Sequence, residues 1–150
     1  MSTQSELLTW GSAQLKELST DSGGASPMAE ARYLLAWALG VDSLLRAPLE
    51  VSPIAEASYR TAVMKRAGRI PRSHVTGQMY FRGLKLDAGA GVFTVRPETE
   101  MLVEHVLELI SKEGIPEGEW VDLCSGSAAI ALSLSLEGKH HVTAVEVDPS

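Results

Sequence analysis

Apolar residues in the first half of the chain recur at the spacing of a helix. This pattern covers residues 5–67, and stretches that contain glycine or proline interrupt it at residues 20–27, 40–43 and 47–53. Apolar side chains three and four positions apart share one face of a helix, and that face needs another surface to cover it. The pattern therefore predicts a small bundle of helices.

The clearest helix in this bundle is expected over Pro27–Leu39. Ser26 is a good N-cap residue, Pro27 suits the first helical position, and Gly40 suits a left-handed stop. We expect the apolar stripe of this helix to pack against its neighbours. The stripe consists of Ala31, Leu34, Leu35, Ala38 and Leu39.

The hydrophobic pattern changes after residues 67–73, where glycine and proline indicate a linker. Residues 74–95 contain two apolar and aromatic runs on either side of the sequence DAGAG at residues 87–91. This arrangement predicts a β-hairpin with a long turn. We therefore expect a helical domain at residues 1–73 and a second domain at residues 74–150.

A second strong helix is expected at residues 97–112. Pro97 and the acidic residues after it favour a helix start, and Gly114 favours its end. The predicted buried face consists of Leu102, Val103, Val106, Leu109 and Ile110.

The last part of the chain has the order strand, helix, strand, at residues 120–123, 128–137 and 142–147. Two strands joined in this way normally lie parallel, with a right-handed connection. The turn at residues 124–128 is then at the carboxyl end of the first strand, where parallel sheets bind their ligands. The chain is thus expected to combine a helical part with an α/β part.

Composition excludes several classes of protein. The chain has 150 residues, 45% of them hydrophobic and 21% charged, which is an ordinary globular composition. Its net charge of −6 argues against a general nucleic-acid binder, which needs many cationic contacts. The one local basic group is expected to be a solvated helix end, and it consists of Lys65, Arg66, Arg69 and Arg72.

Cysteine use and the absence of export signals indicate the compartment. A single cysteine excludes an internal disulfide and a multi-cysteine metal site, which fits a reducing cytosol. No apolar run is long enough to span a membrane, and the polar N-terminus is not a secretory signal. We expect a soluble cytoplasmic protein that uses no metal.

The turn at residues 124–128 keeps one glycine where a dinucleotide-binding turn needs three. Gly126 leaves the backbone bare for a ligand, but Cys124 and Ala128 replace the other glycines, so no dinucleotide site is expected. Glu146 ends the next strand, where a carboxylate can accept hydrogen bonds from ribose hydroxyls. Asp122 can accept hydrogen bonds from the turn or contact a ligand, and these roles do not exclude one another.

Three segments considered together resemble one family of enzymes. The segments are FTVRPETEMLVEHVL, VDLCSGSAAIALSLS and VTAVEVDPS, and they are similar to the release factor glutamine methyltransferases. Two further segments, EARYLLAWALGV and RIPRSHVTGQMYFRGLKL, are similar to the small helical domain of that family and to the hairpin after it. The resemblance covers nearly the whole chain.

The resemblance implies a fold, an activity and a partner. The fold is a helical substrate-recognition domain, a β-hairpin linker and the start of the Rossmann-like sheet of a class I methyltransferase. The implied activity is N5-methylation of a glutamine side chain in a peptide-chain release factor, with S-adenosyl-L-methionine as cofactor. The implied partner is this protein substrate, without membrane, metal or direct nucleic-acid binding.

The resemblance also assigns roles to individual residues. The residues that match the cofactor site are Asp122, Ser125, Gly126, Ser127 and Glu146. The residues that match the cleft beside cofactor and substrate are Arg96, Pro97, Glu98, Thr99 and Glu100.

The chain departs from the family pattern in two respects. Val95 replaces a usual proline, and Cys124 and Ala128 replace usual glycines. The chain also contains no Asn-Pro-Pro-Tyr motif, which in this family holds the amide that is methylated. An amide nitrogen is a poor nucleophile that must be aligned with the methyl group, so we expect these 150 residues alone to have little or no turnover.

Two other functions stay open at this point. A methyltransferase that acts on a nucleobase amino group would share the cofactor half of the site, and the local basic group favours it slightly. A non-catalytic module that docks on a translation factor would need only the helical bundle, and the missing motif favours it for this chain.

Overall fold

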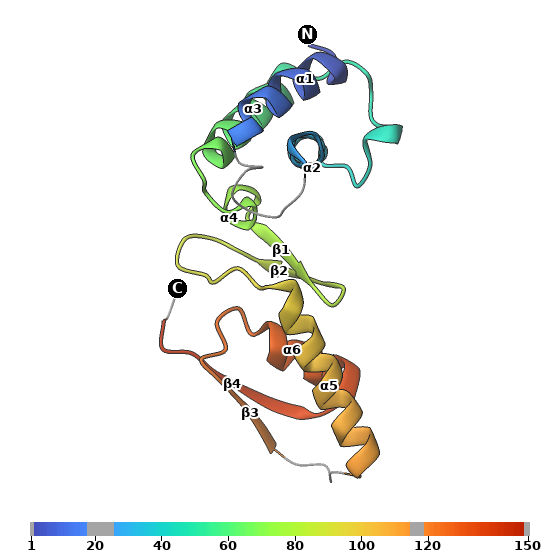
Figure 1. Cartoon of the computed structure of the whole chain (residues 1–150), viewed down its shortest axis with the longest axis vertical. Helices are drawn as coiled ribbons and strands as arrows, with labels where there is room; N and C mark the ends of the chain where they lie inside the picture. Colours follow the sequence, from blue (N-terminus) through green and yellow to red (C-terminus); the bar gives the residue numbers. More distant parts are fainter. Residues whose placement is uncertain (1, 18–25, 115–118, 149–150) are drawn as a thin grey trace. The chain divides into compact units, whose positions relative to one another are not determined.

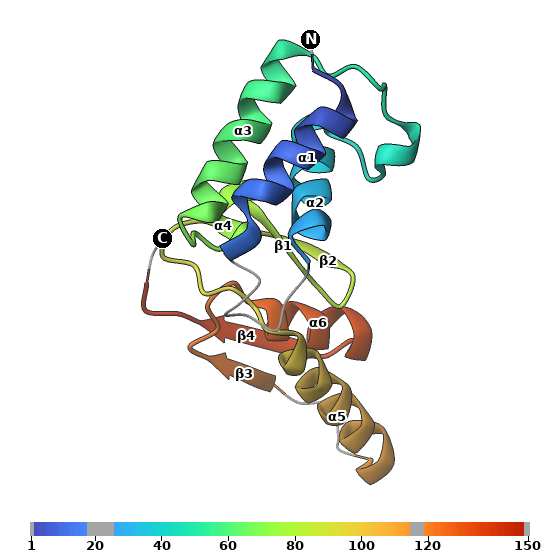
Figure 2. The same cartoon turned by 45° about the horizontal axis from the view of Figure 1, so that its top comes forward.

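The computed structural model describes residues 2–17, 26–114 and 119–148. The chain divides into two compact units, an N-terminal unit (Met1–Thr76) and a C-terminal unit (Gly77–Ser150). Figures 1 and 2 show the elements of each unit. The structure has mostly helices in its N-terminal unit and two small sheets in its C-terminal unit.

The N-terminal unit is a bundle built on three helices. Its elements are α1 (Gln4–Gln14), α2 (Pro27–Leu39), the 3-10 helix η2 (Leu44–Arg46), α3 (Pro53–Ala67) and the short α4 (Arg72–Thr76). Helix α1 packs on both α2 and α3. Their shared core contains large side chains with almost no exposure, among them Leu7, Leu15, Leu34, Leu35, Val51, Tyr59 and Val63.

Helix α2 confirms the prediction made for it. It covers Pro27–Leu39, the Ser26 hydroxyl accepts a hydrogen bond from the N–H of Ala29 at 3.2 Å, and Gly40 is left-handed with φ of 66°. Of the predicted stripe, Ala31, Leu34 and Leu35 are fully buried, and the other two members are partly buried in the same core. The interruption predicted at residues 20–27 lies almost entirely outside the described residues.

The linker predicted at residues 67–73 is shorter in the structure. Helix α3 ends at Ala67 and α4 begins at Arg72, so only residues 68–71 connect the two helices without helical structure. Helix α4 also takes up residues 74–76, which were assigned to the hairpin. The indole N–H of Trp37 donates to the carbonyl of Thr76 at 3.1 Å and ties this short helix to α2.

The hairpin exists, but its turn is elsewhere. Strands β1 (Gln78–Phe81) and β2 (Leu84–Asp87) are antiparallel and pair Phe81 with Leu84, which leaves only Arg82 and Gly83 between them. These residues have φ of 45° and 80°. Two successive left-handed residues form the type of tight turn whose twist matches a β-hairpin. The DAGAG sequence therefore starts at the last residue of β2 instead of joining the strands.

Helix α5 (Pro97–Glu113) ends at left-handed Gly114, as predicted. Its buried face is correct at Val103, which is fully buried, and at Val106, which is partly buried. It is wrong at Leu102 and Leu109, which are 52% and 51% exposed. The helix packs along one narrow stripe, which also includes Leu107. This stripe faces α6 and the buried hairpin residues Met79, Phe81 and Leu86.

The predicted order strand, helix, strand is confirmed. Strand β3 (Glu119–Leu123), helix α6 (Ala129–Gly138) and strand β4 (His141–Val145) follow one another, and the two strands are parallel. Helix α6 packs on both strands and covers one side of the sheet. On the other side the apolar residues Val121, Leu123 and Val145 are 58%, 70% and 45% exposed.

Candidate functional site

The turn between β3 and α6 begins where both parallel strands end. The N–H of Ser125 donates to the carbonyl of Val145 at 3.0 Å, which extends the pairing of the two strands beyond Leu123. The N–H of Ala128 then donates to the carbonyl of Ser125 at 2.8 Å and closes a tight loop. The turn is therefore fixed to the end of β4 as well as to its own strand.

Three alternating residues of this turn have left-handed backbone. Cys124, Gly126 and Ala128 have φ of 59°, 54° and 58°. Glycine adopts such angles freely, whereas a residue with a Cβ atom is strained there by roughly 1 to 2 kcal/mol. Cys124 and Ala128 thus keep the backbone path of a glycine-rich turn without its glycines.

Gly126 leaves open space at the tip of the turn. A Cβ atom built on Gly126 would meet no atom within 4 Å apart from those of Gly126 and its two chain neighbours, and Gly126 itself is exposed. Its neighbours Ser125 and Ser127 are half-buried, and Cys124 is an exposed free thiol. A ligand can therefore approach bare backbone at this position.

Asp122 holds the start of helix α6. The N-cap residue Ala128 makes no side-chain cap, so the first N–H groups of the helix need another acceptor. One oxygen of Asp122 accepts a hydrogen bond from the N–H of Ala131 at 3.2 Å. The carboxylate also favours the positive end of the helix dipole.

Glu146 connects the end of β4 to the turn. Its Oε2 accepts a hydrogen bond from the N–H of Gly126 at 2.7 Å, and its Oε1 accepts from the N–H groups of Val147 and Asp148 at 2.8 and 3.1 Å. Hydrogen bonds from the backbone N–H groups of Asp148, Gly126 and Val147 lower the pKa of Glu146 below the usual glutamate value. The group is exposed and ionised at neutral pH, so a negative charge lies beside the tip of the turn.

The VRPETE segment lies at the start of α5. Its described hydrogen bonds join it to the hairpin turn and to itself, and not to the turn between β3 and α6. Arg96, Pro97 and Glu98 are exposed, and the half-buried Thr99 donates its N–H to the carbonyl of Arg96 at 3.0 Å. Glu100 accepts a hydrogen bond from the backbone N–H of Arg82 at 3.0 Å. No hydrogen bond between described residues joins this segment to the turn at residues 124–128.

Arg82 is a central residue that the sequence analysis did not identify. Its guanidinium donates to both carboxylate oxygens of Glu137 at 2.7 and 2.5 Å, to Glu104 at 2.8 Å and to the carbonyl of Glu100 at 3.1 Å. These contacts raise the pKa of Arg82 and lower that of Glu137. Arg82 thereby ties the hairpin turn to α5 and α6, and the Arg-Gly pair at the turn was the signal that could have revealed it.

The local basic group of the N-terminal unit is partly used inside the fold. Arg66 and Arg72 both bind the carboxylate of Glu30, at 2.7 and 3.3 Å, and the guanidinium of Arg72 lies 4.3 Å from the ring centre of Tyr33. Glu30 is 8% exposed, so these contacts neutralise a buried charge. Two of the four cations therefore have a structural role.

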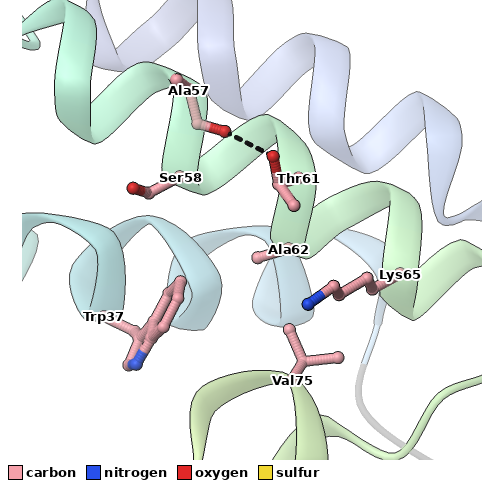
Figure 3. A pocket seen from close by; sticks show the side chains of 7 residues that line it. All are labelled: Trp37, Ala57, Ser58, Thr61, Ala62, Lys65 and Val75. Carbon is pink, nitrogen blue, oxygen red and sulfur yellow. Dashed lines mark hydrogen bonds between the residues drawn. The ribbon is translucent and has the colours of Figure 1, made fainter.

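A surface cavity of about 320 Å³ lies in the N-terminal unit between α2, α3 and α4 (Figure 3). Trp37, Ala62 and Val75 give it apolar walls, and Lys65 lies on its edge. The Thr61 hydroxyl donates to the carbonyl of Ala57 at 2.9 Å and is used within its own helix. The other polar side chains of the lining are those of Ser58 and Lys65, and none of the described residues of the lining is a histidine or carries a carboxylate.

Within residues 2–17, 26–114 and 119–148, no cluster of three or more His, Cys, Asp or Glu side chains could hold a metal ion. None of the helices in that part of the chain is both long and apolar enough to cross a membrane.

Comparison with known proteins identifies the relatives of this chain. Residues 6–77 match a family model described as the PrmC N-terminal domain. A release factor glutamine methyltransferase of Streptomyces coelicolor is 41% identical over 138 residues, which cover 90% of this chain and 48% of that protein. The chain belongs to the release factor glutamine methyltransferase family.

Other family members show the same partial coverage. The release factor glutamine methyltransferase of Bifidobacterium longum is 38% identical and matches 97% of this chain and 50% of its own length. The release factor glutamine methyltransferase of Deinococcus radiodurans is 34% identical and matches 96% of this chain and 51% of its own length. The chain spans about half the length of these curated relatives and corresponds to their N-terminal half.

Proposed function

We propose that this chain is the N-terminal portion of an S-adenosyl-L-methionine-dependent enzyme that methylates a glutamine side chain of a peptide-chain release factor at N5. In this proposal the helical part, predicted at residues 1–73, recognises the release factor. Residues 74–150 supply the hairpin and the first strand–helix–strand unit of a Rossmann-like methyltransferase sheet. The turn closed by Glu146, in a chain of this family, carries the proposal.

The residues of the turn fit the cofactor. The exposed, ionised Glu146 offers acceptor oxygens for ribose hydroxyls, and the open position beside Gly126 leaves room for a ligand against the backbone. The C-terminal unit has 12 Asp and Glu against 5 Lys and Arg, which favours a cationic ligand. The residues proposed to hold the cofactor are Asp122, Ser125, Gly126, Ser127 and Glu146.

When bound, the cofactor would supply an electrophilic methyl group on a sulfonium, for transfer to the amide nitrogen of the substrate. This chain contributes binding and orientation. Glu146 fixes the ribose, and Asp122 orients the turn because it holds the start of α6. We propose the exposed segment that starts α5 as one wall of the cleft, formed by Arg96, Pro97, Glu98, Thr99 and Glu100.

The sequence contains no Asn-Pro-Pro-Tyr motif to hold the amide nitrogen. Correct alignment of two reacting groups can supply several kcal/mol of the barrier, roughly 7 to 11 in favourable cases. We therefore propose that residues 1–150 bind cofactor and release factor but have little or no turnover by themselves.

Calorimetric titration with S-adenosylhomocysteine tests the cofactor site. The wild-type chain should bind, and Glu146→Ala should weaken binding at least about tenfold because hydrogen bonds to a charged group are lost. Glu119→Ala removes a carboxylate from β3 outside the turn and should bind like the wild type. If neither the wild type nor the Glu146 variant gives a binding signal, this chain does not contain a cofactor site.

A pull-down separates the proposed substrate from the alternatives. The chain should retain release factor and not tRNA, and binding to RNA alone would favour a nucleobase methyltransferase. Binding to release factor without any binding of S-adenosylhomocysteine would favour the non-catalytic docking module, which the missing motif supports.

A further inference from the structure

The carboxylate of Glu146 is almost fully occupied by the protein's own backbone. Each carboxylate oxygen has about two acceptor positions. Oε1 uses both, on the N–H groups of Val147 and Asp148, and Oε2 uses one, on the N–H of Gly126. One acceptor position on Oε2 is left for a ligand.

A ribose presents two neighbouring hydroxyl groups, and both need an acceptor if both are to bind the same carboxylate. We propose that Glu146 acts as a latch on the turn, and that a ligand with a vicinal diol obtains its second acceptor position by displacing the N–H of Gly126. This inference rests on the proposed function, because it takes the cofactor's ribose as the ligand of Glu146.

The Gly126 bond is the one that can open. The N–H groups of Val147 and Asp148 belong to the residues that directly follow Glu146, so their bonds are local. The bond to Gly126 spans 20 residues and joins two separate segments, and the space around Gly126 is open. Release exchanges one N–H···O bond for one O–H···O bond and leaves the Gly126 N–H free to donate to the ligand or to water.

The latch has a consequence for ligand selectivity. At a carboxylate with free oxygens, loss of one ribose hydroxyl removes a hydrogen bond to a charged group and costs about 10- to 150-fold in affinity. With the latch, a ligand with one hydroxyl takes the vacant position while Gly126 keeps its bond. The better of the 2′-deoxy and 3′-deoxy analogues of S-adenosylhomocysteine should therefore bind within about fivefold of the parent compound.

Nuclear magnetic resonance of the ¹⁵N-labelled chain tests the latch directly through the Gly126 amide. In the free chain this amide should exchange slowly with water, and Glu146→Gln should speed its exchange at least about fivefold, whereas the matched variant Glu119→Gln should not. Saturating S-adenosylhomocysteine should shift the Gly126 signal strongly, and the better deoxy analogue should leave it near its free position. Rapid exchange of Gly126 in the free wild type would overturn the latch.

The ligand results separate the latch from the proposed function. Suppose that S-adenosylhomocysteine and the better deoxy analogue both bind and give the same Gly126 signal. In that case the cofactor site stands and the latch is wrong. If both deoxy analogues bind more than about tenfold more weakly than S-adenosylhomocysteine, the latch is also wrong. If S-adenosylhomocysteine does not bind at all, the proposed cofactor site fails and the displacement fails with it.

Discussion

The two units of this chain differ in how completely they cover their apolar surfaces. In the N-terminal unit, Leu7, Leu34, Leu35 and Val63 are fully buried within a core to which all three long helices contribute. In the C-terminal unit, Phe81 and Val103 are the most deeply buried apolar residues of a smaller cluster, whereas one side of the β3–β4 pair exposes its apolar residues. The first unit closes its core with its own helices, and the second presents a sheet with one open side.

The units also differ in charge. The N-terminal unit has 8 Lys and Arg against 7 Asp and Glu, and the C-terminal unit has 5 against 12. The N-terminal unit is therefore nearly neutral, whereas the C-terminal unit is acidic, which agrees with the cationic ligand of the proposed function. The comparison teaches that the closed apolar core and the excess of negative charge lie in different halves of the chain.

The largest predicted effect contrasts one leucine in each unit. Leu34→Ala should lower the free energy of unfolding of the N-terminal unit by about 2 to 5 kcal/mol, because it leaves a cavity in a closed core. Leu123→Ala, at a side chain 70% exposed, should change the stability of the C-terminal unit by less than about 0.5 kcal/mol. Hydrogen exchange of the α2 and β4 amides measures each unit separately, and similar losses in both units would contradict the comparison.

The next effect tests what holds the C-terminal unit together. Arg82→Asn keeps a residue that favours the tight turn before Gly83 but removes the guanidinium contacts to Glu100, Glu104 and Glu137. We expect a loss of about 1 to 2 kcal/mol, limited because the acceptors are partly exposed. Lys85→Gln, which removes a positive charge from the same hairpin, should be nearly neutral in urea denaturation.

The contribution of Arg82 should also depend on pH. Its hydrogen bonds lower the pKa of Glu137, so the carboxylate stabilises the folded unit above the ordinary glutamate pKa. That stabilisation is lost as the pH falls through the lowered value, below about 4.5. The stability difference between wild type and Arg82→Asn should therefore be smaller at pH 3 than at pH 7, and an equal difference would exclude this ion pair as its cause.

A smaller effect concerns strain in the turn. Ala128→Gly removes a strain of roughly 1 to 2 kcal/mol and adds up to about 1 kcal/mol of unfolded-chain entropy, so the C-terminal unit should gain between about 0 and 2 kcal/mol. Cys124→Gly should have the same sign. Ala128→Val should destabilise, because a β-branched residue is worse at positive φ. Thermal unfolding measures all three variants, and a stable valine variant would show that the backbone angle is not left-handed.

The smallest effect concerns a buried hydroxyl in α6. Ser133 is 1% exposed, and its Oγ has no hydrogen-bond partner among the described residues. Ser133→Ala should stabilise the C-terminal unit by up to about 1 kcal/mol, since it removes a desolvated polar group. Ser135→Ala, on the exposed side of the same helix, reports the helix-propensity gain alone, and the difference between the two variants isolates the buried hydroxyl.

Local signals in the sequence were sufficient where several of them agreed. Helix α2 was predicted with its correct ends because Ser26, Pro27 and Gly40 mark them independently of the rest of the fold. The strand–helix–strand order was also predictable, since short apolar runs flank a turn and a helix rich in alanine and leucine.

Other features depend on partners that a sequence does not reveal. The glycine-rich DAGAG sequence suggested the hairpin turn, but the pairing of Phe81 with Leu84 placed the turn at Arg82 and Gly83. Likewise, Leu102 and Leu109 fit the apolar face of α5 by spacing, yet the surface that meets this helix is too narrow to cover them. Periodicity identifies an apolar face but not the width of its partner.

At the candidate site, the sequence indicated Gly126 and Glu146 but not the hydrogen bond between them. That bond depends on the register of two strands, which brings together residues 20 positions apart. For Glu100 the sequence analysis missed the partner itself. Its backbone partner Arg82 lies in the hairpin turn, which the sequence analysis had placed at residues 87–91.

The left-handed angles at Cys124, Gly126 and Ala128 also bear on how such turns are found. A search for the letters of a glycine-rich motif passes over this chain, since only one of the three positions has glycine. A search of coordinates for three alternating left-handed residues directly after a parallel strand would find it. Backbone angles thus identify turns of this kind even where other residues occupy the left-handed positions.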